Sequence, residues 1–140
     1  MELVEPSLGP RHELPGAGEE PTIGEAISNA ACDIAEAVHA RALVVPTFSG
    51  RTATAVARLR PRQPIVAITH DERVALVLAL EWGVAPLVIA ACDDVEALWS
   101  RSLAAAREAR LVDSGDRVVI TAGTLVNVPG STNVIKVDVV

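Results

Sequence analysis

Aromatic residues, cysteines and basic residues are all scarce in this chain. Only 2% of its 140 residues are aromatic, with no Tyr, one Phe and two Trp, so a core must be built from Ala, Val, Leu and Ile. The two cysteines, Cys32 and Cys92, lie too far apart for a metal-binding or redox motif. We expect each to be a small buried residue in a reducing cytoplasm. The net charge of −6 argues against nucleic-acid binding, which depends on basic patches.

Long hydrophobic runs are also missing. No stretch approaches the ~20 uninterrupted apolar residues that a membrane span needs, and the N-terminus has no basic-then-apolar signal pattern. We therefore expect a cytoplasmic protein that contacts neither membrane nor nucleic acid. Half of the residues are nevertheless hydrophobic, which excludes a disordered chain and suffices for the core of one domain. The histidines lie apart from one another, so no metal site is expected.

Residues 1–21 differ in composition from the rest. They contain four prolines and three glycines, and their five glutamates against one arginine account for four of the six net negative charges. Such a segment has little that can pack, and we interpret it as a flexible acidic tail. The folded domain is expected over residues 22–140.

From Thr22 onward, helical and strand patterns alternate. Thr22 and Glu25 have the spacing of a capping box at a helix start. Helices are expected over 22–40, 50–59, 71–82 and 94–111, and strands over 42–47, 64–69, 86–91, 117–121 and 133–140. Strands that alternate with helices indicate a parallel sheet covered on both faces. The last strand follows its predecessor without a helix, so it must return antiparallel.

The predicted fold class is therefore α/β. It is a three-layer α/β/α sandwich with a five-stranded mixed sheet, in which four strands are parallel and the last is an antiparallel edge strand. In such sheets ligands bind beyond the carboxyl ends of the strands, so the loops at that edge are the first places to look for a site.

The loop after the first strand has the chemistry of a phosphate site. Thr47, Ser49 and Thr52 offer hydroxyl groups, and Gly50 allows close approach of the backbone. The N–H groups of the following helix supply partial positive charge, and Arg51 adds a full charge with forked donors. The alternative is structural: Ser49 simply caps the helix and Arg51 lies in solvent.

A second candidate is the long loop 123–133, which leaves the same edge of the sheet. Long loops at this edge are often functional, so we expect Gly123, Thr124, Pro129 and Gly130 to belong to a lid; the alternative is a wide turn. His70, at the end of the second strand, is a further possible anion contact, although it is more simply part of a helix cap.

The remaining notable side chains are interpreted as structural. Arg58, Arg60 and Arg62 are expected to be solvated or paired with acids. Trp82 and Trp99 fall on expected helices with apolar neighbours and are expected to pack in the core or an interface. No nucleophile beside a base, paired-carboxylate site or nucleotide-binding P-loop is found, so no catalytic residue is expected.

Several segments, in this order and spacing, resemble the C-terminal regulatory domain of pyruvate kinase. The resemblance covers roughly residues 21–140. It is carried by residues 25–33 (EAISNAACD), 47–53 (TFSGRTA), 60–67 (RPRQPIVA), 82–86 (WGVAP), 115–123 (GDRVVITAG) and 130–133 (GSTN). The fold that this resemblance implies is the same three-layer mixed sheet.

The resemblance also implies a ligand. In many pyruvate kinases this loop holds a phosphate of an allosteric sugar phosphate, often fructose 1,6-bisphosphate, and Thr47, Ser49, Gly50, Arg51 and Thr52 match it residue by residue. The loop before the last strand, here about residues 123–130, folds over the effector in the family. Phe48 occupies the variable position of the first loop and is a further possible ligand contact.

One departure concerns the second phosphate. Family members that use the bisphosphate often hold it with a Trp and an Arg, whose places fall near Ala91 and Leu98 here. Neither matches. A hexose or pentose monophosphate, or AMP, is therefore at least as strongly expected.

The resemblance further implies what this chain lacks. Pyruvate kinase chemistry, phosphoryl transfer from phosphoenolpyruvate to ADP with Mg²⁺ and K⁺, resides in a barrel domain that precedes the regulatory one. No barrel is present here, so we expect a non-catalytic domain without a cofactor of its own. Its expected partners are a small phosphorylated metabolite and a pyruvate kinase barrel domain, as part of a longer chain or as a separate one.

Two other functions remain open from the sequence. Family members assemble partly through this domain, so it would serve as an oligomerisation module if the exposed last strand pairs with that of a second copy to form a homo-oligomer. A phosphatase or transferase activity at the loop around Ser49 is the third hypothesis, although no general base is evident.

Overall fold

The computed structural model describes residues 20, 22–123 and 132–140. The predicted tail of residues 1–21 lies almost wholly outside this part. The elements follow one another as expected, strand after helix, until the last two strands. They are α1 (Ile23–Ala37), β1 (Ala42–Pro46), α2 (Arg51–Arg58), β2 (Ile65–Thr69), α3 (Glu72–Leu78), β3 (Val84–Val88), α4 (Val95–Glu108), β4 (Arg117–Gly123) and β5 (Thr132–Val139). Among the described residues, every helix is too short or too polar to traverse a bilayer.

The sheet has the predicted mixed topology. Its strand order is β3-β2-β1-β4-β5, with parallel pairing from β3 through β4 and antiparallel pairing between β4 and β5. The chain moves from β1 outward through β2 and β3, then returns to place β4 on the other side of β1. The carboxyl ends of β1 and β4 therefore flank the point where strand order reverses, where α/β proteins bind ligands.

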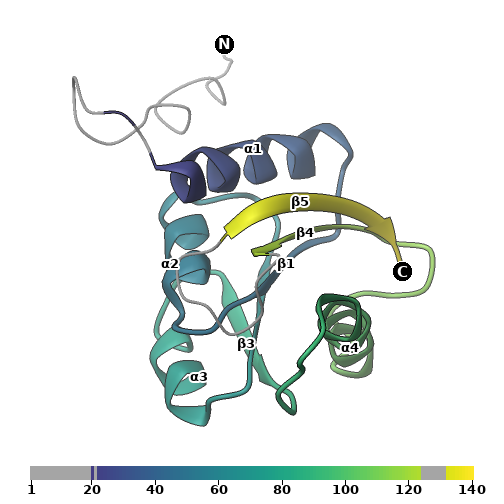
Figure 1. Cartoon of the computed structure of the whole chain (residues 1–140). Helices are drawn as coiled ribbons and strands as arrows, with labels where there is room; N and C mark the ends of the chain where they lie inside the picture. The colour runs from purple at the N-terminus through teal and green to yellow at the C-terminus, as the bar shows by residue number, and fades with distance from the viewer. Residues whose placement is uncertain (1–19, 21, 124–131) are drawn as a thin grey trace.

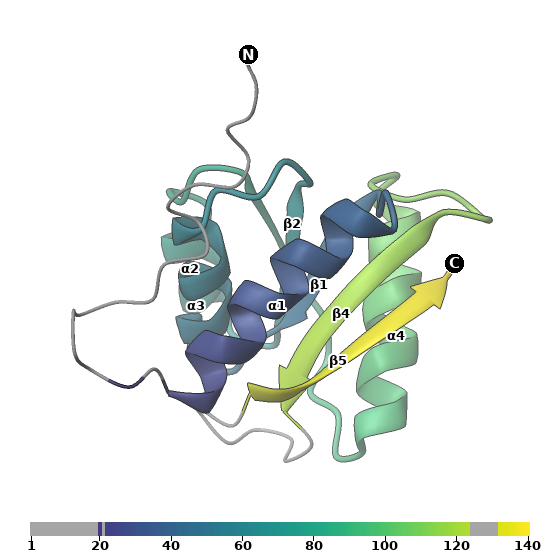
Figure 2. The same cartoon turned by 90° about the horizontal axis from the view of Figure 1, so that it is seen from above.

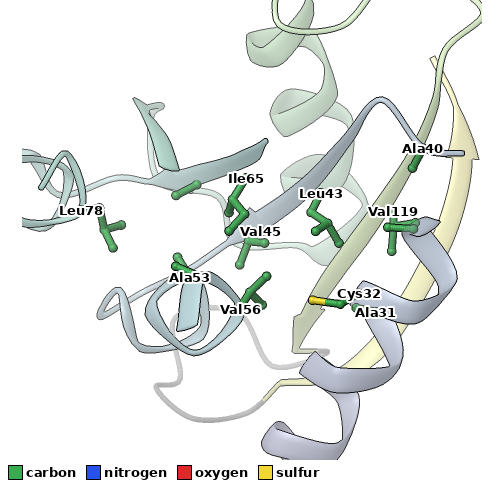
Figure 3. Close-up of a cluster of buried hydrophobic side chains, with 13 residues drawn as sticks. Ala31, Cys32, Ala40, Leu43, Val45, Ala53, Val56, Ile65, Leu78 and Val119 are labelled. Carbon is green, nitrogen blue, oxygen red and sulfur yellow. The ribbon is translucent and has the colours of Figure 1, made fainter. Parts of the chain in front are cut away.

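Helices cover both faces of the sheet, which confirms the three-layer fold (Figures 1 and 2). One core cluster lies beneath α1, α2 and α3, and it includes Cys32, Leu43, Val56 and Leu78, all labelled in Figure 3. A second cluster lies on the opposite face under α4 and includes Ala106. Both faces of β1 and β2 are buried, which explains their continuous apolar sequence.

The first helix starts as its sequence predicts. The Thr22 hydroxyl accepts a hydrogen bond from the Glu25 N–H at 3.1 Å. In return, the Glu25 carboxylate accepts one from the Thr22 N–H at 2.7 Å. The capping box is thus complete, and the N-terminal end of α1 is held beside α2 on the same face of the sheet (Figures 1 and 2).

The prediction for the third strand was shifted along the chain. β3 spans Val84–Val88 rather than 86–91, so Pro86 lies in the middle of the strand instead of at its start. Ile65 donates to the Gly83 carbonyl, and Ile89 donates to the Thr69 carbonyl. The backbone N–H and C=O groups at odd positions of β3 therefore point toward β2. The backbone nitrogen of Pro86 points the other way, toward the free edge of the sheet. A proline is tolerated there because its missing N–H has no partner to lose.

The helix before β3 is also shorter than predicted. α3 ends at Leu78 rather than Trp82, and the chain turns through Gly83, whose φ is +77°. Trp82 consequently lies beyond the helix with 66% of its surface exposed. Its ring packs under the Arg60 guanidinium, 5.3 Å from the ring centroid. Trp82 therefore does not pack in the core, and only the interface half of its prediction remains. Trp99 does pack against the second core cluster.

Candidate functional site

The loop between β1 and α2 is closed by Thr47 and Gly50. The Thr47 hydroxyl accepts a hydrogen bond from the Gly50 N–H at 2.9 Å, and the Thr47 N–H donates to the Ile68 carbonyl at 2.8 Å. Gly50 has a φ of +90°, a conformation that residues with a Cβ rarely adopt. A Cβ at this position would also lie 3.3 Å from Val74 Cγ1. The turn therefore requires glycine, and it starts α2 directly beyond the carboxyl end of β1.

Ser49 does not cap α2, so the structural alternative for this residue was wrong. The N-cap residue is Gly50, and no side chain caps the helix. The Ser49 hydroxyl accepts only a long hydrogen bond of 3.4 Å from the Arg51 N–H. The first turn of α2 therefore keeps backbone N–H groups that no side-chain cap satisfies. Such groups, together with the helix dipole, are favourable donors to an anion.

Thr52 connects this loop to the start of the last strand. Its hydroxyl lies 2.6 Å from the hydroxyl of Thr132, in a hydrogen bond in which either oxygen can donate. Thr132 is only 7% exposed. The bond joins residues 80 positions apart and brings the end of the predicted lid region to the N-terminal end of α2.

A pocket of about 680 Å³ opens at this place, a size typical of sites for small metabolites, which span roughly 300–1,000 Å³. Three elements form it: the N-terminal end of α1, one side of α2 with the preceding loop, and the first residue of β5. The lining residues are Thr22, Gly24, Glu25, Ser28, Ser49, Gly50, Arg51, Thr52, Thr54, Ala55, Arg58 and Thr132. Of the five predicted phosphate-binding residues, all but Thr47 line it; Thr47 is 8% exposed and serves the turn.

Sequence reasoning missed the α1 wall of the pocket, Thr132 and Arg58. Residues 22–28 and Thr132 reach the site only through the tertiary fold, so no local spacing could reveal them. Arg58 is exposed, as expected for a solvated side chain, and it also lines the pocket, which was not predicted. Its signal was present in the sequence, because Arg51 and Arg58 are seven residues apart and lie on one side of a helix.

The pocket has a positive balance of charge. Two arginines line it against one carboxylate, that of Glu25. Glu25 is already engaged in the capping box, where its carboxylate accepts the Thr22 N–H. The buried hydroxyl residues Ser28 and Thr132, 2% and 7% exposed, add polar groups at its walls. This combination suits an anionic, hydroxyl-bearing ligand.

Phe48 and His70 pack against each other rather than into the pocket. Their ring centroids are 5.4 Å apart at an interplanar angle of 46°, and neither residue lines the pocket. Asp71 caps α3 beside them. The Arg73 N–H donates to the Asp71 carboxylate at 2.8 Å, and this hydrogen bond, with the nearby Arg73 charge, holds the pKa of Asp71 below its ordinary value of 3.8. His70 thus precedes a helix cap, as the simpler interpretation expected.

Most of the predicted lid lies outside the described residues. Thr124, Pro129 and Gly130 belong to the undescribed segment 124–131. Gly123 is the last residue of β4, and it pairs with Thr132 next to a register irregularity.

The part of the chain that the structure describes holds no group of three His, Cys, Asp or Glu side chains that could bind a metal ion. The Mg²⁺ and K⁺ that the resemblance implies belong to the barrel domain of the intact enzyme, and no residue of this chain was predicted to hold them.

Comparison with known proteins supports the resemblance. The sequence model of "Pyruvate kinase, alpha/beta domain" matches residues 25–138, which includes all of the helices and strands except the first two residues of α1 and the last residue of β5. The chain belongs to this family. Its fold and its membership of the pyruvate kinase alpha/beta domain family, both expected from sequence, are thus confirmed.

Curated relatives are pyruvate kinases of bacteria. The chain is 39% identical over 122 residues to pyruvate kinase of Clostridium acetobutylicum. It is 41% identical over 119 residues to pyruvate kinase 2 of Synechocystis sp. and 40% identical over 119 residues to the enzyme of Geobacillus stearothermophilus. These matches cover 85–87% of this chain but 20–26% of the relatives. The chain thus spans only a fifth to about a quarter of their length.

Proposed function

We propose that this chain is a regulatory domain that binds a phosphorylated metabolite at the N-terminal end of α2. Ser49 and Thr52 bind the phosphate through their hydroxyls, and the first-turn N–H groups and the Arg51 guanidinium add charge-assisted bonds. Thr47 and Gly50 shape the loop. The ligand is a sugar phosphate or a nucleoside monophosphate, and the protein binds it in the cytoplasm. No catalytic residue and no cofactor are assigned to the domain itself.

The observation that carries this proposal is an uncapped helix start inside a pocket. The first turn of α2 has no side-chain cap, and it opens, with Arg51, into a space of about 680 Å³. A phosphate group alone needs far less room, so the space beyond it is available to the sugar or nucleoside. Ser28 and Thr132 also line this space, and in this proposal their hydroxyls bind hydroxyl groups of the sugar or nucleoside.

A regulatory role also needs a catalytic partner. The pyruvate kinases that this chain resembles are four to five times longer than the part it matches. We propose that the partner is the remainder of such a chain, where phosphoryl transfer takes place, and that ligand binding here alters that partner's activity.

Isothermal titration calorimetry tests the proposal directly. Fructose 6-phosphate, ribose 5-phosphate and AMP are titrated separately into the folded chain, and at least one is expected to give saturable heat. Thr52→Val removes one hydroxyl at nearly constant volume and should weaken binding about tenfold, as expected for one charge-assisted hydrogen bond of about 1.4 kcal/mol. Thr69→Val, a buried threonine of β2 away from the pocket, is the matched control. Absence of heat with all three ligands would refute the proposal.

Oligomerisation is the second candidate function, and the two edges of the sheet favour it. Pro86 interrupts the hydrogen-bonding groups at the β3 edge, whereas β5 carries no proline and exposes Val137 and Val139 by 45% and 60%. A second copy would therefore add at β5, and not at β3. Light scattering should then show a homo-oligomer that Val137→Lys converts to monomer, with Val88→Lys on β3 as the control. A wild-type monomer at high concentration would exclude this function.

A further inference from the structure

The residues that form the pocket leave it with positive charge that they do not balance. Arg51 and Arg58 line it. Neither forms an ion pair with an acidic side chain among the described residues, where the ion pairs seen are Arg62–Glu36, Arg73–Asp71 and Lys136–Asp138. The one carboxylate of the lining, that of Glu25, already accepts the Thr22 N–H at 2.7 Å. Both guanidinium groups are therefore available to an anion from outside the pocket.

The chain itself carries such anions directly before the first residue of the pocket lining. Residues 13–20, which we call the acidic segment, have the sequence ELPGAGEE, with three glutamates and no basic residue. The last of them, Glu20, is exposed. Only Pro21 separates it from Thr22, which lines the pocket. The acidic segment is thus attached to the protein at the rim of the pocket.

The attachment is short enough for all three carboxylates to reach the pocket. A chain advances by at most about 3.6 Å per residue, so Glu20 lies within about 7 Å of Thr22, and Glu13 lies within about 32 Å. Groups tethered over such short lengths have effective concentrations in the range of about 1 mM. The acidic segment can therefore compete with a free metabolite for the pocket.

Pro21 prevents α1 from running on into the acidic segment. The residue before a proline disfavours the helical conformation, and α1 begins at Ile23 with Thr22 as its N-cap. Glu20 is accordingly outside the helix. The simpler role for Glu19 and Glu20 is to stabilise the N-terminal end of α1 through its dipole. That role predicts an effect on stability and none on ligand affinity, so the two can be told apart.

We infer that the acidic segment is an intramolecular competitor for the anion pocket. Its carboxylates occupy the space at Arg51, Arg58 and the first turn of α2 in the ligand-free chain, and a phosphorylated metabolite binds by displacing them. The phosphate prevails because it carries nearly two charges on three acceptor oxygens, against one charge on each carboxylate. The acidic segment thereby raises the ligand concentration at which the site fills. This inference rests on the proposed function, since competition requires phosphate binding at α2.

Neutralising the acidic segment should strengthen ligand binding. Wild type and the triple variant Glu13→Gln, Glu19→Gln, Glu20→Gln are titrated with fructose 6-phosphate and with inorganic phosphate, by isothermal titration calorimetry at low ionic strength. The variant should bind both about fivefold more tightly, the gain expected if the segment occupies the pocket in about four chains of five. Added salt, which screens exposed charges, should narrow the difference.

A matched variant controls for the overall change in charge. Glu96→Gln, Glu108→Gln and Asp113→Asn together remove three negative charges from exposed positions on α4 and directly after it, across the sheet from the pocket. This variant should bind both ligands as the wild type does. An equal gain in affinity here would mean that the acidic segment acts only through net charge, and the inference would be wrong.

The remaining outcomes separate the inference from the proposed function. Equal dissociation constants for wild type and the Gln variant of the acidic segment, with or without a loss of thermal stability, would overturn the competition and leave phosphate binding intact. In the ¹⁵N-labelled wild type, saturating fructose 6-phosphate should also shift the Glu19 and Glu20 amides as the segment is displaced. If neither chain binds either ligand, the proposed function fails, and the competition fails with it.

Discussion

Gly50 and Gly115 share a left-handed backbone but differ in their surroundings. Their φ values are +90° and +93°. A Cβ on Gly50 would lie 3.3 Å from Val74 and 3.5 Å from Leu78, whereas a Cβ on Gly115 would meet nothing within 4 Å. Both positions carry the conformational cost of a side chain in the left-handed region. At Gly50 a side chain would add a steric cost, so Gly50 sets how closely the β1–α2 loop can approach α3.

This difference gives a paired prediction. Gly115→Ala should lower the free energy of unfolding by about 1 kcal/mol, from backbone strain alone. Gly50→Ala should lower it by about 2 kcal/mol, because Val74 and Leu78 must also shift. Urea denaturation monitored by circular dichroism measures both values. Equal losses would show that the contact with α3 has no effect on stability.

At the scale of elements, α3 divides sharply into a buried and an exposed side. Leu78 is 1% exposed and packs in the core cluster beneath α2, whereas Leu80, two residues later, is 87% exposed. Leu76, Val77 and Trp82 are exposed as well. The end of α3 and the turn after it therefore present apolar side chains to the surroundings, while one leucine anchors the helix.

The two leucines should respond very differently to truncation. Leu78→Ala should cost about 3 kcal/mol of unfolding free energy, because it leaves a cavity in the core. Leu80→Ala should change the same quantity by less than about 0.5 kcal/mol, since an exposed side chain loses little burial. Thermal and chemical denaturation of the two variants test this. A comparable loss in Leu80→Ala would mean that the exposed side is covered in solution.

The sequence was sufficient to predict the elements because their signals are local. Hydrophobic periodicity and the capping box of Thr22 and Glu25 marked helices, and the absence of a helix before β5 predicted its antiparallel direction. The misplaced start of β3 has a non-local cause. A proline can lie inside a strand only if that strand is at an edge of the sheet. Whether the strand that contains Pro86 is an edge strand depends on the strand order of the whole sheet, and not on the residues next to Pro86 in sequence.

The same limit applied to the pocket. The loop 47–52 was recognisable because its hydroxyls, glycine and arginine are contiguous. The α1 wall and Thr132 were not, since the fold brings residues 22–28 and 132 to α2 from opposite ends of the domain. Arg58 is an intermediate case. Its spacing from Arg51 could be read from the sequence, but the pocket that both residues line is formed only when α1 and α2 pack together.

At the scale of the whole molecule, the domain is one part of a larger architecture in its relatives. Their pyruvate kinase chains contain it as 20–26% of their length. A ligand bound between α1, α2 and the start of β5 would tie together segments from both ends of the domain. Such a ligand can affect a catalytic partner only if these segments, or surfaces next to them, contact that partner.

The most direct measurement of the central claim is a titration of the ¹⁵N-labelled chain with fructose 6-phosphate, followed by amide chemical shifts. Phosphate binding at the start of α2 predicts the largest saturable shifts at the N–H groups of Gly50, Arg51 and Thr52, with smaller ones at Thr132. The amides of α4, across the sheet, should remain unchanged. Saturable shifts centred away from the β1–α2 loop, or no shifts with this ligand, ribose 5-phosphate or AMP, would contradict the account.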